Sequence, residues 1–257
     1  MESIEISIVF LFGTLIGSFL NVCIYRIPEG LSVVRPASRC PECFEPIRWY
    51  QNIPILSWLV LRGKCGQCGA SISIRYAAVE MLTGLLFVMV VTVFGFSFVS
   101  FIYAVFIASM VVITFIDIDH QIIPDAISLP GIIVGFIFSF FNPSLAWSDS
   151  IFGILLGGGS LYVVAFIYEL LTKKEGMGGG DIKLLAMIGA FLGWKSILPI
   201  IFISSLLGTI VGIPLMLFKG ETSKFAIPFG PFLALAAVVY LFFGEAIVQW
   251  YWASMSG

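Results

Sequence analysis

Long apolar segments recur along the whole of this 257-residue chain, and they constrain its fold more than any other feature. Hydrophobic residues make up 60% of the sequence and charged residues only 11%, a composition far from that of a soluble domain. Several segments reach the roughly 17 to 20 residues needed to cross the hydrocarbon core of a bilayer. The sequence therefore predicts an all-α polytopic membrane protein with about eight transmembrane helices.

Polar segments and prolines separate the predicted spans and divide the chain. We expect a first transmembrane helix in residues 1–26, a polar loop domain in 27–75 and a transmembrane core in 76–257. The first span is flanked by Glu2 and Glu5 rather than by basic residues, so a removable signal peptide is not expected. No internal sequence repeat is apparent. The predicted spans are residues 4–25, 77–94, 98–116, 126–141, 152–171, a short sixth span starting at 182–192, 197–218 and 228–251.

Four of the five cysteines lie in the polar loop as two close pairs. Cys40 and Cys43 form one C-x2-C knuckle, and Cys65 and Cys68 form the other. Two such knuckles supply four thiolates for tetrahedral coordination of one Zn²⁺. Two disulfides or free thiols are the alternatives. We expect a structural zinc site, because four sulfur ligands leave no open position and so short a loop has little core of its own.

Basic residues fall mainly on one side of the predicted membrane topology. Eight spans put the 27–75 loop and the links at 117–125, 172–181 and 219–227 on the same side, and of 13 basic residues only Lys195 lies opposite. The positive-inside rule places the basic side in the cytoplasm. Reducing conditions there favour thiolate–metal bonds over disulfides.

Two acidic clusters at this predicted boundary carry the candidate chemistry. Asp117 ends the third span, and Asp181 follows a glycine run at the start of the sixth. A carboxylate at the edge of an apolar segment is costly in a bilayer and is therefore a functional candidate. Two carboxylates within a few ångströms share a proton, so the ionised one can activate water while the protonated one hydrogen-bonds a scissile carbonyl. The structural alternative is a flexible loop in which Asp181 caps the next helix.

Several neighbours of these two aspartates are also candidates. Asp119 is expected to be more solvated than Asp117, while Asp125 is expected to cap the following helix. Gly178 and Gly180 would let an extended substrate backbone approach Asp181 closely. Lys183 would act on the charge of Asp181 or bind lipid phosphate.

The end of the first span is polar, and it has a packing and a functional interpretation. Gly17 is expected at a helix–helix contact, with Asn21 hydrogen-bonded across it and Arg26 extending to the membrane surface. A role in contacting substrate is the alternative for these three residues. Glu80, inside the second span, is expected to pair with Arg75 or Arg26.

Three classes of function remain open from the residues alone. An acid-pair protease fits the two clusters, since no serine or cysteine nucleophile has a matched base and the chain has one histidine. An ion-coupled transporter that uses intramembrane carboxylates is the second class, and a zinc-dependent membrane scaffold is the third. Nothing in the composition or the net charge of −2 suggests nucleic-acid binding.

Several blocks, in order, resemble the type IV prepilin peptidase family, the bifunctional leader peptidase/N-methyltransferases. The glycine run with its aspartate is the G-x-G-D motif that these enzymes share with presenilin-like intramembrane proteases. Ala77 stands where many members have proline, a difference that should affect only the start of the second span. The matching blocks are residues 17–26, the four-cysteine loop, Arg75-Tyr76 with Val79-Glu80, Asp117-Ile118-Asp119 with Ile123-Pro124-Asp125, and Gly178-Gly179-Gly180-Asp181 with Lys183.

The resemblance implies an aspartic endopeptidase at the cytoplasmic face of the bacterial inner membrane. Its substrates would be type IV prepilins and type II secretion pseudopilins, cut after a glycine at the end of a basic leader. Asp117 and Asp181 would be the catalytic pair, with Asp119 as the substitute in the first position. The resemblance also implies methylation of the new N-terminus with S-adenosylmethionine. The family associates that activity with the N-terminal third, which makes Gly17, Asn21 and Arg26 candidates for cofactor binding.

Overall fold

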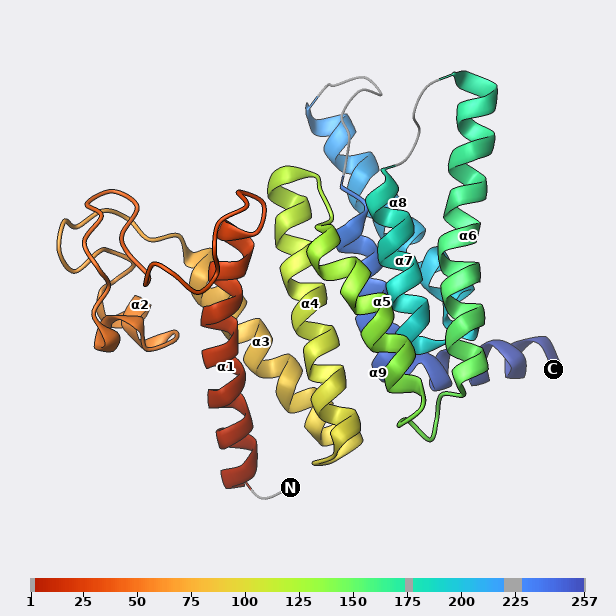
Figure 1. Cartoon of the computed structure of the whole chain (residues 1–257), viewed down its shortest axis with the longest axis horizontal. Helices are drawn as coiled ribbons and strands as arrows, with labels where there is room; N and C mark the ends of the chain where they lie inside the picture. Colours follow the sequence, from red (N-terminus) through yellow and green to blue (C-terminus); the bar gives the residue numbers. More distant parts are fainter. Residues whose placement is uncertain (1–2, 174–177, 220–227, 257) are drawn as a thin grey trace. The chain divides into compact units, whose positions relative to one another are not determined.

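The computed structural model describes residues 3–173, 178–219 and 228–256, and the described part is helical with only two isolated β-bridges (Figure 1). Residues 175–177 of the predicted glycine-rich link and most of the predicted 219–227 link lie outside the described residues. The elements are α1 (Ser3–Arg26), η1 (Trp49–Asn52), α2 (Leu56–Val60), α3 (Ile74–Phe94), α4 (Phe98–His120), α5 (Asp125–Ser139), α6 (Trp147–Thr172), α7 (Gly179–Leu192), η2 (Trp194–Ser196), α8 (Ile197–Lys219) and α9 (Gly230–Ser256).

Each predicted span contains a helix, but the helices are not of equal length. Among the described residues, six helices are long and apolar enough to cross a membrane, namely α1, α3, α4, α6, α8 and α9. Helices α5 and α7 have 15 and 14 residues, so at about 1.5 Å per residue they measure roughly 21–22 Å, less than the ~30 Å hydrocarbon core. Helices this short suit positions enclosed by other helices, where protein rather than lipid surrounds the backbone.

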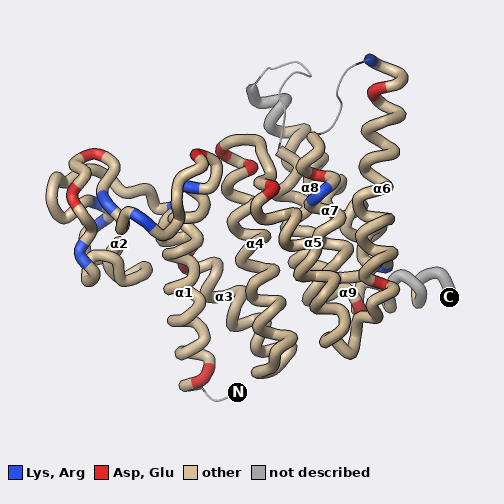
Figure 2. The backbone as a smooth tube through the Cα atoms, in the orientation of Figure 1, with Lys and Arg blue, Asp and Glu red and all other residues tan. Residues whose placement is uncertain are grey.

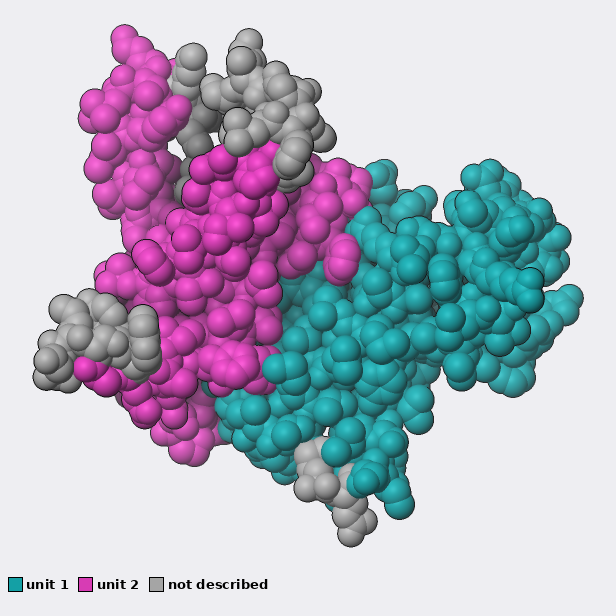
Figure 3. All heavy atoms as spheres, turned by 180° about the vertical axis from the view of Figure 1, so that it is seen from behind, with its two compact units in different colours: residues 1–112 teal, residues 113–257 magenta. Residues whose placement is uncertain are grey.

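The chain divides into two compact units, unit 1 (Met1–Val112) and unit 2 (Ile113–Gly257), coloured separately in Figure 3. The division falls within α4, so this helix contributes residues to both units. It differs from the sequence-based division at residues 26 and 75. Both aspartates belong to unit 2 and all five cysteines to unit 1, so each candidate site lies within a single unit.

In unit 1, α1 and α3 pack through glycines. A Cβ atom at Gly13 would lie 2.8 Å from the Cα of Gly84, and one at Gly17 would lie 2.7 Å from the Cα of Glu80. Small residues allow helix backbones to approach closely in membranes. The Asn21 amide donates a 3.0 Å hydrogen bond to the Tyr76 carbonyl across the same contact, so the predicted packing of Gly17 and Asn21 is confirmed.

The loop between α1 and α3 is anchored to the helices by a buried carboxylate. Glu80, which is 8% exposed, accepts a 2.7 Å hydrogen bond from the backbone N–H of Ile55 and another from the Ser18 hydroxyl. The Arg26 guanidinium binds backbone carbonyls of the loop, so of the two partners expected for Glu80, Arg75 or Arg26, Arg26 is not the one. Figure 2 shows the basic residues of unit 1 along this loop and its ends.

In unit 2, α7 forms the core. Every residue from Leu184 to Phe191 is buried, and α7 contacts α5, α6 and α9; Figure 1 shows it between α5 and α6. On the α6 side, Gly153 and Gly189 bring the backbones into contact, and the Ser150 hydroxyl donates to the Ala190 carbonyl at 2.8 Å. This packing fixes the position of α7, and with it the aspartate in its first turn.

Candidate active site and metal centre

Asp117 lies near the end of α4, in unit 2, and is almost fully enclosed. Its side chain is 4% exposed. The backbone N–H of Gly230, the first residue of α9, donates a 2.9 Å hydrogen bond to Asp117 Oδ2. A free N–H at a helix N-terminus is a natural donor to a carboxylate. Asp117 therefore has a fixed orientation, set by a residue 113 positions later in the chain.

Asp181 lies in the first turn of α7 and is half-buried. Gly178, rather than Asp181, occupies the N-cap position, so the capping interpretation of Asp181 is wrong. Asp181 and Asp117 interact electrostatically. The structure thus brings together two carboxylates that the sequence separates by 64 positions.

A short chain of van der Waals contacts links the surroundings of the two aspartates. A Cβ atom at Gly230 would lie 2.6 Å from Asp117 Oδ2 and 3.2 Å from Ile123 Cδ1. A Cβ atom at Gly180 would lie 2.9 Å from Ile123 Cβ. Ile123 thus packs against the two glycines that adjoin the carboxylates. Only glycine at both positions lets these side chains approach the backbone this closely.

The remaining predicted residues of unit 2 lie at the edge of this site. Asp119 is exposed, as expected for a residue two positions after Asp117, since this spacing turns a helical side chain to nearly the opposite face. Asp125 is the first residue of α5 and Pro124 its N-cap, so the predicted N-cap role is wrong. Instead Lys183 Nζ pairs with Asp125, at 2.6 Å to Oδ1 and 2.8 Å to Oδ2.

The four-cysteine cluster in unit 1 has the dimensions of a metal site. The sulfur atoms of Cys40, Cys43, Cys65 and Cys68 all lie within 4.8 Å of one another, and Cys40 Sγ is 3.9 Å from Cys68 Sγ. Four thiolates at about 2.3 Å from a tetrahedral Zn²⁺ would be ~3.8 Å apart. The cysteines are free, so the cluster could hold a metal ion.

The pKa values of the cysteine thiols also favour the binding of a cation. Backbone N–H groups of Cys68 and Gln67 lower the pKa of the Cys65 thiol to about 6. The N–H of Glu45 also lowers the pKa of Cys43, but desolvation and the sulfurs of Cys68 and Cys40 outweigh it and raise this pKa to about 12. One thiolate forms readily while its neighbour is kept protonated. A bound cation would allow all four to ionise.

The two knuckles are copies of one backbone turn, a repeat that sequence inspection missed. Isolated bridges join Arg39 to Pro46 and Lys64 to Ser71, an offset of 25 residues. The hydrogen bonds repeat with the same offset, as do the positive φ angles of Phe44 and Gly69. The repeated bonds are Cys40 N–H to Glu45 O with Phe44 N–H to Cys40 O, and Cys65 N–H to Ala70 O with Gly69 N–H to Cys65 O.

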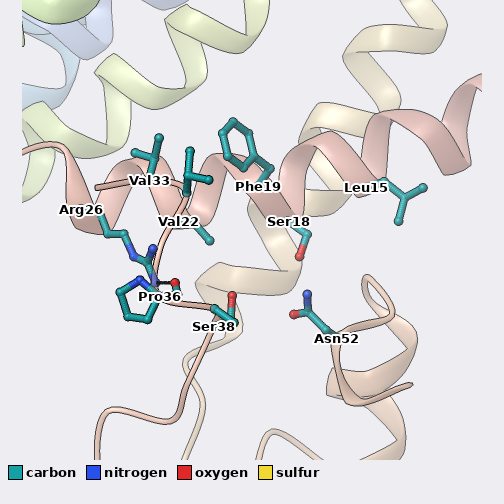
Figure 4. A pocket seen from close by; sticks show the side chains of 11 residues that line it. Leu15, Ser18, Phe19, Val22, Arg26, Val33, Pro36, Ser38 and Asn52 are labelled. Atoms are coloured by element: carbon teal, nitrogen blue, oxygen red, sulfur yellow. Dashed lines mark hydrogen bonds between the residues drawn. The ribbon is translucent and has the colours of Figure 1, made fainter. Parts of the chain in front are cut away.

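A pocket of about 250 Å³ lies between one stripe of α1 and the loop of unit 1 (Figure 4). Arg26 lines it and donates to the carbonyls of Ser32 and Pro36 at 2.9 and 2.8 Å. Gly17 and Asn21 are not among its lining residues, because they face α3. The lining residues are Leu15, Ser18, Phe19, Val22, Arg26, Val33, Val34, Pro36, Ala37, Ser38 and Asn52.

Comparison with known proteins identifies the family of the chain that carries these two sites. The chain matches the "Bacterial Peptidase A24 N-terminal domain" model over residues 11–94 and the "Type IV leader peptidase family" model over residues 104–213. The chain belongs to the type IV leader peptidase family. The first match falls within unit 1 and the second contains Asp117 and Asp181. No solved structure matches the chain.

Relatives named "Prepilin leader peptidase/N-methyltransferase" are similar to this chain over nearly its full length. The Aeromonas hydrophila protein is 39% identical over 95% of this chain and 93% of its own length. The Pseudomonas aeruginosa protein is 39% identical, covering 94% and 91%, and the Neisseria gonorrhoeae protein 38%, covering 93% and 92%. The family supports a peptidase with methyltransferase activity in a multi-pass membrane protein, and not the transporter alternative.

Sequence reasoning missed two residues of the aspartate site, Gly230 and Ile123. Gly230 stands between Phe229 and Pro231 at the start of an apolar segment, and a glycine there indicates close approach of another group. Ile123 falls in the Ile123-Pro124-Asp125 block of the family resemblance, but that resemblance does not indicate a packing role for it. Its position becomes meaningful only when α7 and α9 are packed beside it.

Proposed function

We propose that the chain is an aspartic endopeptidase that removes the basic leader of type IV prepilins and type II secretion pseudopilins, with Asp117 and Asp181 as its catalytic pair. The observation that carries the proposal is the proximity of these carboxylates, one in α4 and one in α7, which interact electrostatically and adjoin the two glycines that pack against Ile123. They lie in the part of the chain matched by the peptidase family model. Neither Ser–His–Asp nor thiol chemistry is needed, because an acid pair can activate water directly.

The surroundings of each carboxylate suggest its role. The Gly230 N–H donates to Asp117 and would stabilise the negative charge on this carboxylate when it acts as the base, so we assign to Asp117 the proton taken from the attacking water. Asp181, half-buried beside a negative charge, holds the shared proton and donates a hydrogen bond to the scissile carbonyl oxygen. Water oxygen then bonds to the carbonyl carbon. When the C–N bond breaks, a proton from the pair passes to the leaving nitrogen.

We also propose that unit 1 carries the N-methyltransferase activity that the relatives' names include. S-adenosylmethionine supplies a methyl group on a sulfonium sulfur, and the pocket on α1 offers groups that fit the rest of that molecule. The Arg26 guanidinium has five N–H donors, of which two are used within the protein, so donors remain for a carboxylate. Ser18, Ser38 and Asn52 turn polar atoms toward one space (Figure 4), which suits hydroxyl groups and a base edge.

The metal and the membrane orientation complete the proposal. Four thiolates at tetrahedral spacing favour Zn²⁺ in a structural role, held by Cys40, Cys43, Cys65 and Cys68. The concentration of basic residues in the 27–75 loop favours a cytoplasmic location for that loop and for the aspartate pair. A prepilin leader, being basic and synthesised in the cytoplasm, would meet the enzyme on that side.

Mass spectrometry of a prepilin incubated with the purified protein and S-adenosylmethionine tests both activities together. We expect Asp117→Asn and Asp181→Asn each to lower cleavage by at least about 10³-fold while the protein stays folded, as expected for loss of a general acid or base. Asp149→Asn is the matched control, because Asp149 in α6 accepts from Trp194 and an amide oxygen can do the same. Normal cleavage by either active-site variant would refute the pairing.

Asp119→Asn decides between the two candidates for the first carboxylate. Because Asp119 is exposed and Asp117 is enclosed, we expect Asp119→Asn to cleave within about threefold of the unaltered protein, as surface changes usually do. If Asp119→Asn abolished cleavage and Asp117→Asn did not, the catalytic role would move to Asp119.

A further inference from the structure

The ion pair between Lys183 and Asp125 has no role in the chemistry proposed above, yet it joins the two segments that carry the aspartates. Asp125 begins α5, eight residues after Asp117, and Lys183 follows Asp181 by two residues in α7. One ammonium nitrogen contacts both carboxylate oxygens, at 2.6 and 2.8 Å. This bidentate contact lies where the first turns of α5 and α7 meet.

Below this ion pair, α5 and α7 pack side by side in the same direction. A Cβ atom at Gly131 would meet the Met187 side chain, and one at Gly135 would meet Phe191. Further along, the rings of Phe138 and Phe191 lie 6.1 Å apart. The contacts advance together along both helices. The ion pair is therefore the last member of a continuous series and lies at the end nearest Asp181.

The same end of α5 adjoins Ile123, which packs against Gly180 and Gly230. Gly180 precedes Asp181, and Gly230 donates to Asp117. Any shift of Ile123 relative to α7 would therefore change the separation of the two carboxylates. The ion pair spans the same two segments, two residues after Ile123 and three after Gly180, at Asp125 and Lys183, and opposes such a shift.

The ion pair is not expected to contribute much to the stability of the fold. Its side chains are 38% and 56% exposed, and exposed ion pairs contribute little to the free energy of unfolding. Catalysis is far more sensitive to geometry, since a misplacement of about 1 Å can cost roughly 10²-fold in rate. A weak contact can therefore matter to the reaction without mattering to the fold.

We propose that Lys183 and Asp125 are positioning residues for the peptidase reaction, whose ion pair holds the start of α7 against the start of α5 and so sets Asp181 opposite Asp117. This inference rests on the proposed peptidase function. Lys183 acts through Asp125 and not as a direct partner of Asp181, and Asp125 is occupied by Lys183 and is not a receptor for the basic leader.

Charge reversal and its rescue test the proposal on the purified full-length protein. Asp125→Lys and Lys183→Asp each place like charges together, and we expect each to lower kcat for prepilin cleavage roughly tenfold with KM within about twofold, because geometry and not binding is disturbed. The double variant Asp125→Lys/Lys183→Asp restores opposite charges, and its kcat should return to within about threefold. Glu169→Lys, the same charge change at an exposed position of α6, should leave kcat unchanged.

Each other outcome overturns the proposal in a distinguishable way. Unchanged kcat in both single variants would show that the pair is not needed. Loss in Lys183→Asp that the double variant does not restore would assign Lys183 to Asp181 directly. A raised KM with normal kcat in Asp125→Lys would make Asp125 a contact for the leader. If Asp117→Asn abolishes cleavage in the same assay while the reversals do nothing, only the positioning role fails; if Asp117→Asn cleaves normally, the peptidase proposal fails first.

A second double-mutant cycle, with charge-neutralising substitutions, is used if a charge-reversal variant fails to fold. Thermal unfolding and elution on gel filtration show whether each variant is folded. Asp125→Asn and Lys183→Gln remove the charges with little change in size. We expect each to lower kcat about threefold and the double variant to be no worse than the poorer single variant, since both remove one interaction. Losses that multiply in the double variant would show that the two residues act independently, and would refute the pair.

Discussion

The four-cysteine cluster of unit 1 and the aspartate pair of unit 2 are built in opposite ways. The cysteines lie within 29 positions of one another, in a loop with two isolated bridges and few helical turns. The aspartates are 64 positions apart and are held by helices whose facing residues are buried. A local turn repeated twice creates the first site, whereas helix packing creates the second. The cluster should therefore depend on a bound metal ion, and the pair on close packing of side chains against glycine backbone.

Metal removal should produce the largest effect, and it should be confined to unit 1. Metal binding in small thiolate sites contributes on the order of 10 kcal/mol to folding, so chelation should unfold the loop around residues 40–68. Hydrogen exchange followed by mass spectrometry should show protection lost in the knuckle peptides and retained in α7. Loss of protection in α7 as well would mean that the two sites are not built independently.

Gly230→Ala tests whether the aspartate pair depends on close packing against glycine. Its Cβ would lie 2.6 Å from Asp117 Oδ2, so the carboxylate must move, and kcat for leader cleavage should fall roughly 100-fold. Metal content, measured by atomic emission, should not change. Gly159→Ala is the control, because a Cβ there meets nothing within 4 Å. Full activity in Gly230→Ala would show that the close approach does not fix Asp117.

Gly17→Ala asks whether close backbone contact also matters within unit 1. The new Cβ would lie 2.7 Å from the Cα of Glu80, and overpacking of this kind costs about 1–3 kcal/mol. The thermal unfolding midpoint should drop, and cleavage measured well below that midpoint should remain. An unchanged midpoint would indicate that α1 and α3 separate at little cost, which would weaken the packing account of unit 1.

Asn21→Ala should have the smallest effect. It leaves the Tyr76 carbonyl without the 3.0 Å hydrogen bond from the Asn21 amide, a loss of about 1 kcal/mol. Ser7→Ala, which removes an exposed hydrogen bond within α1, is the matched control and should be close to neutral. If N-methylation fell far more than the midpoint shift explains, Asn21 would belong to the cofactor site and not only to the helix contact.

Much of this protein follows from its sequence, because the relevant signals are local. Apolar run length predicts the helices, and two C-x2-C knuckles in one loop predict the thiolate cluster. Gly17 and Asn21 predict a helix contact, since small and polar residues in a membrane span need a partner helix. Each of these inferences uses residues that are neighbours in the chain or share one helical face.

Other features depended on which distant segments meet. The N-cap of α5 is Pro124 and not Asp125, whose carboxylate pairs with Lys183 from another helix. Arg26 serves the loop and not Glu80, and Gly230 and Ile123 gained roles only through their neighbours. The apolar segments by themselves determined that helices form and that a membrane surrounds them. The packing of α5, α6, α7 and α9 decided which carboxylates face each other, because hydrophobic burial has no direction and only the fit of side chains and glycines selects one arrangement.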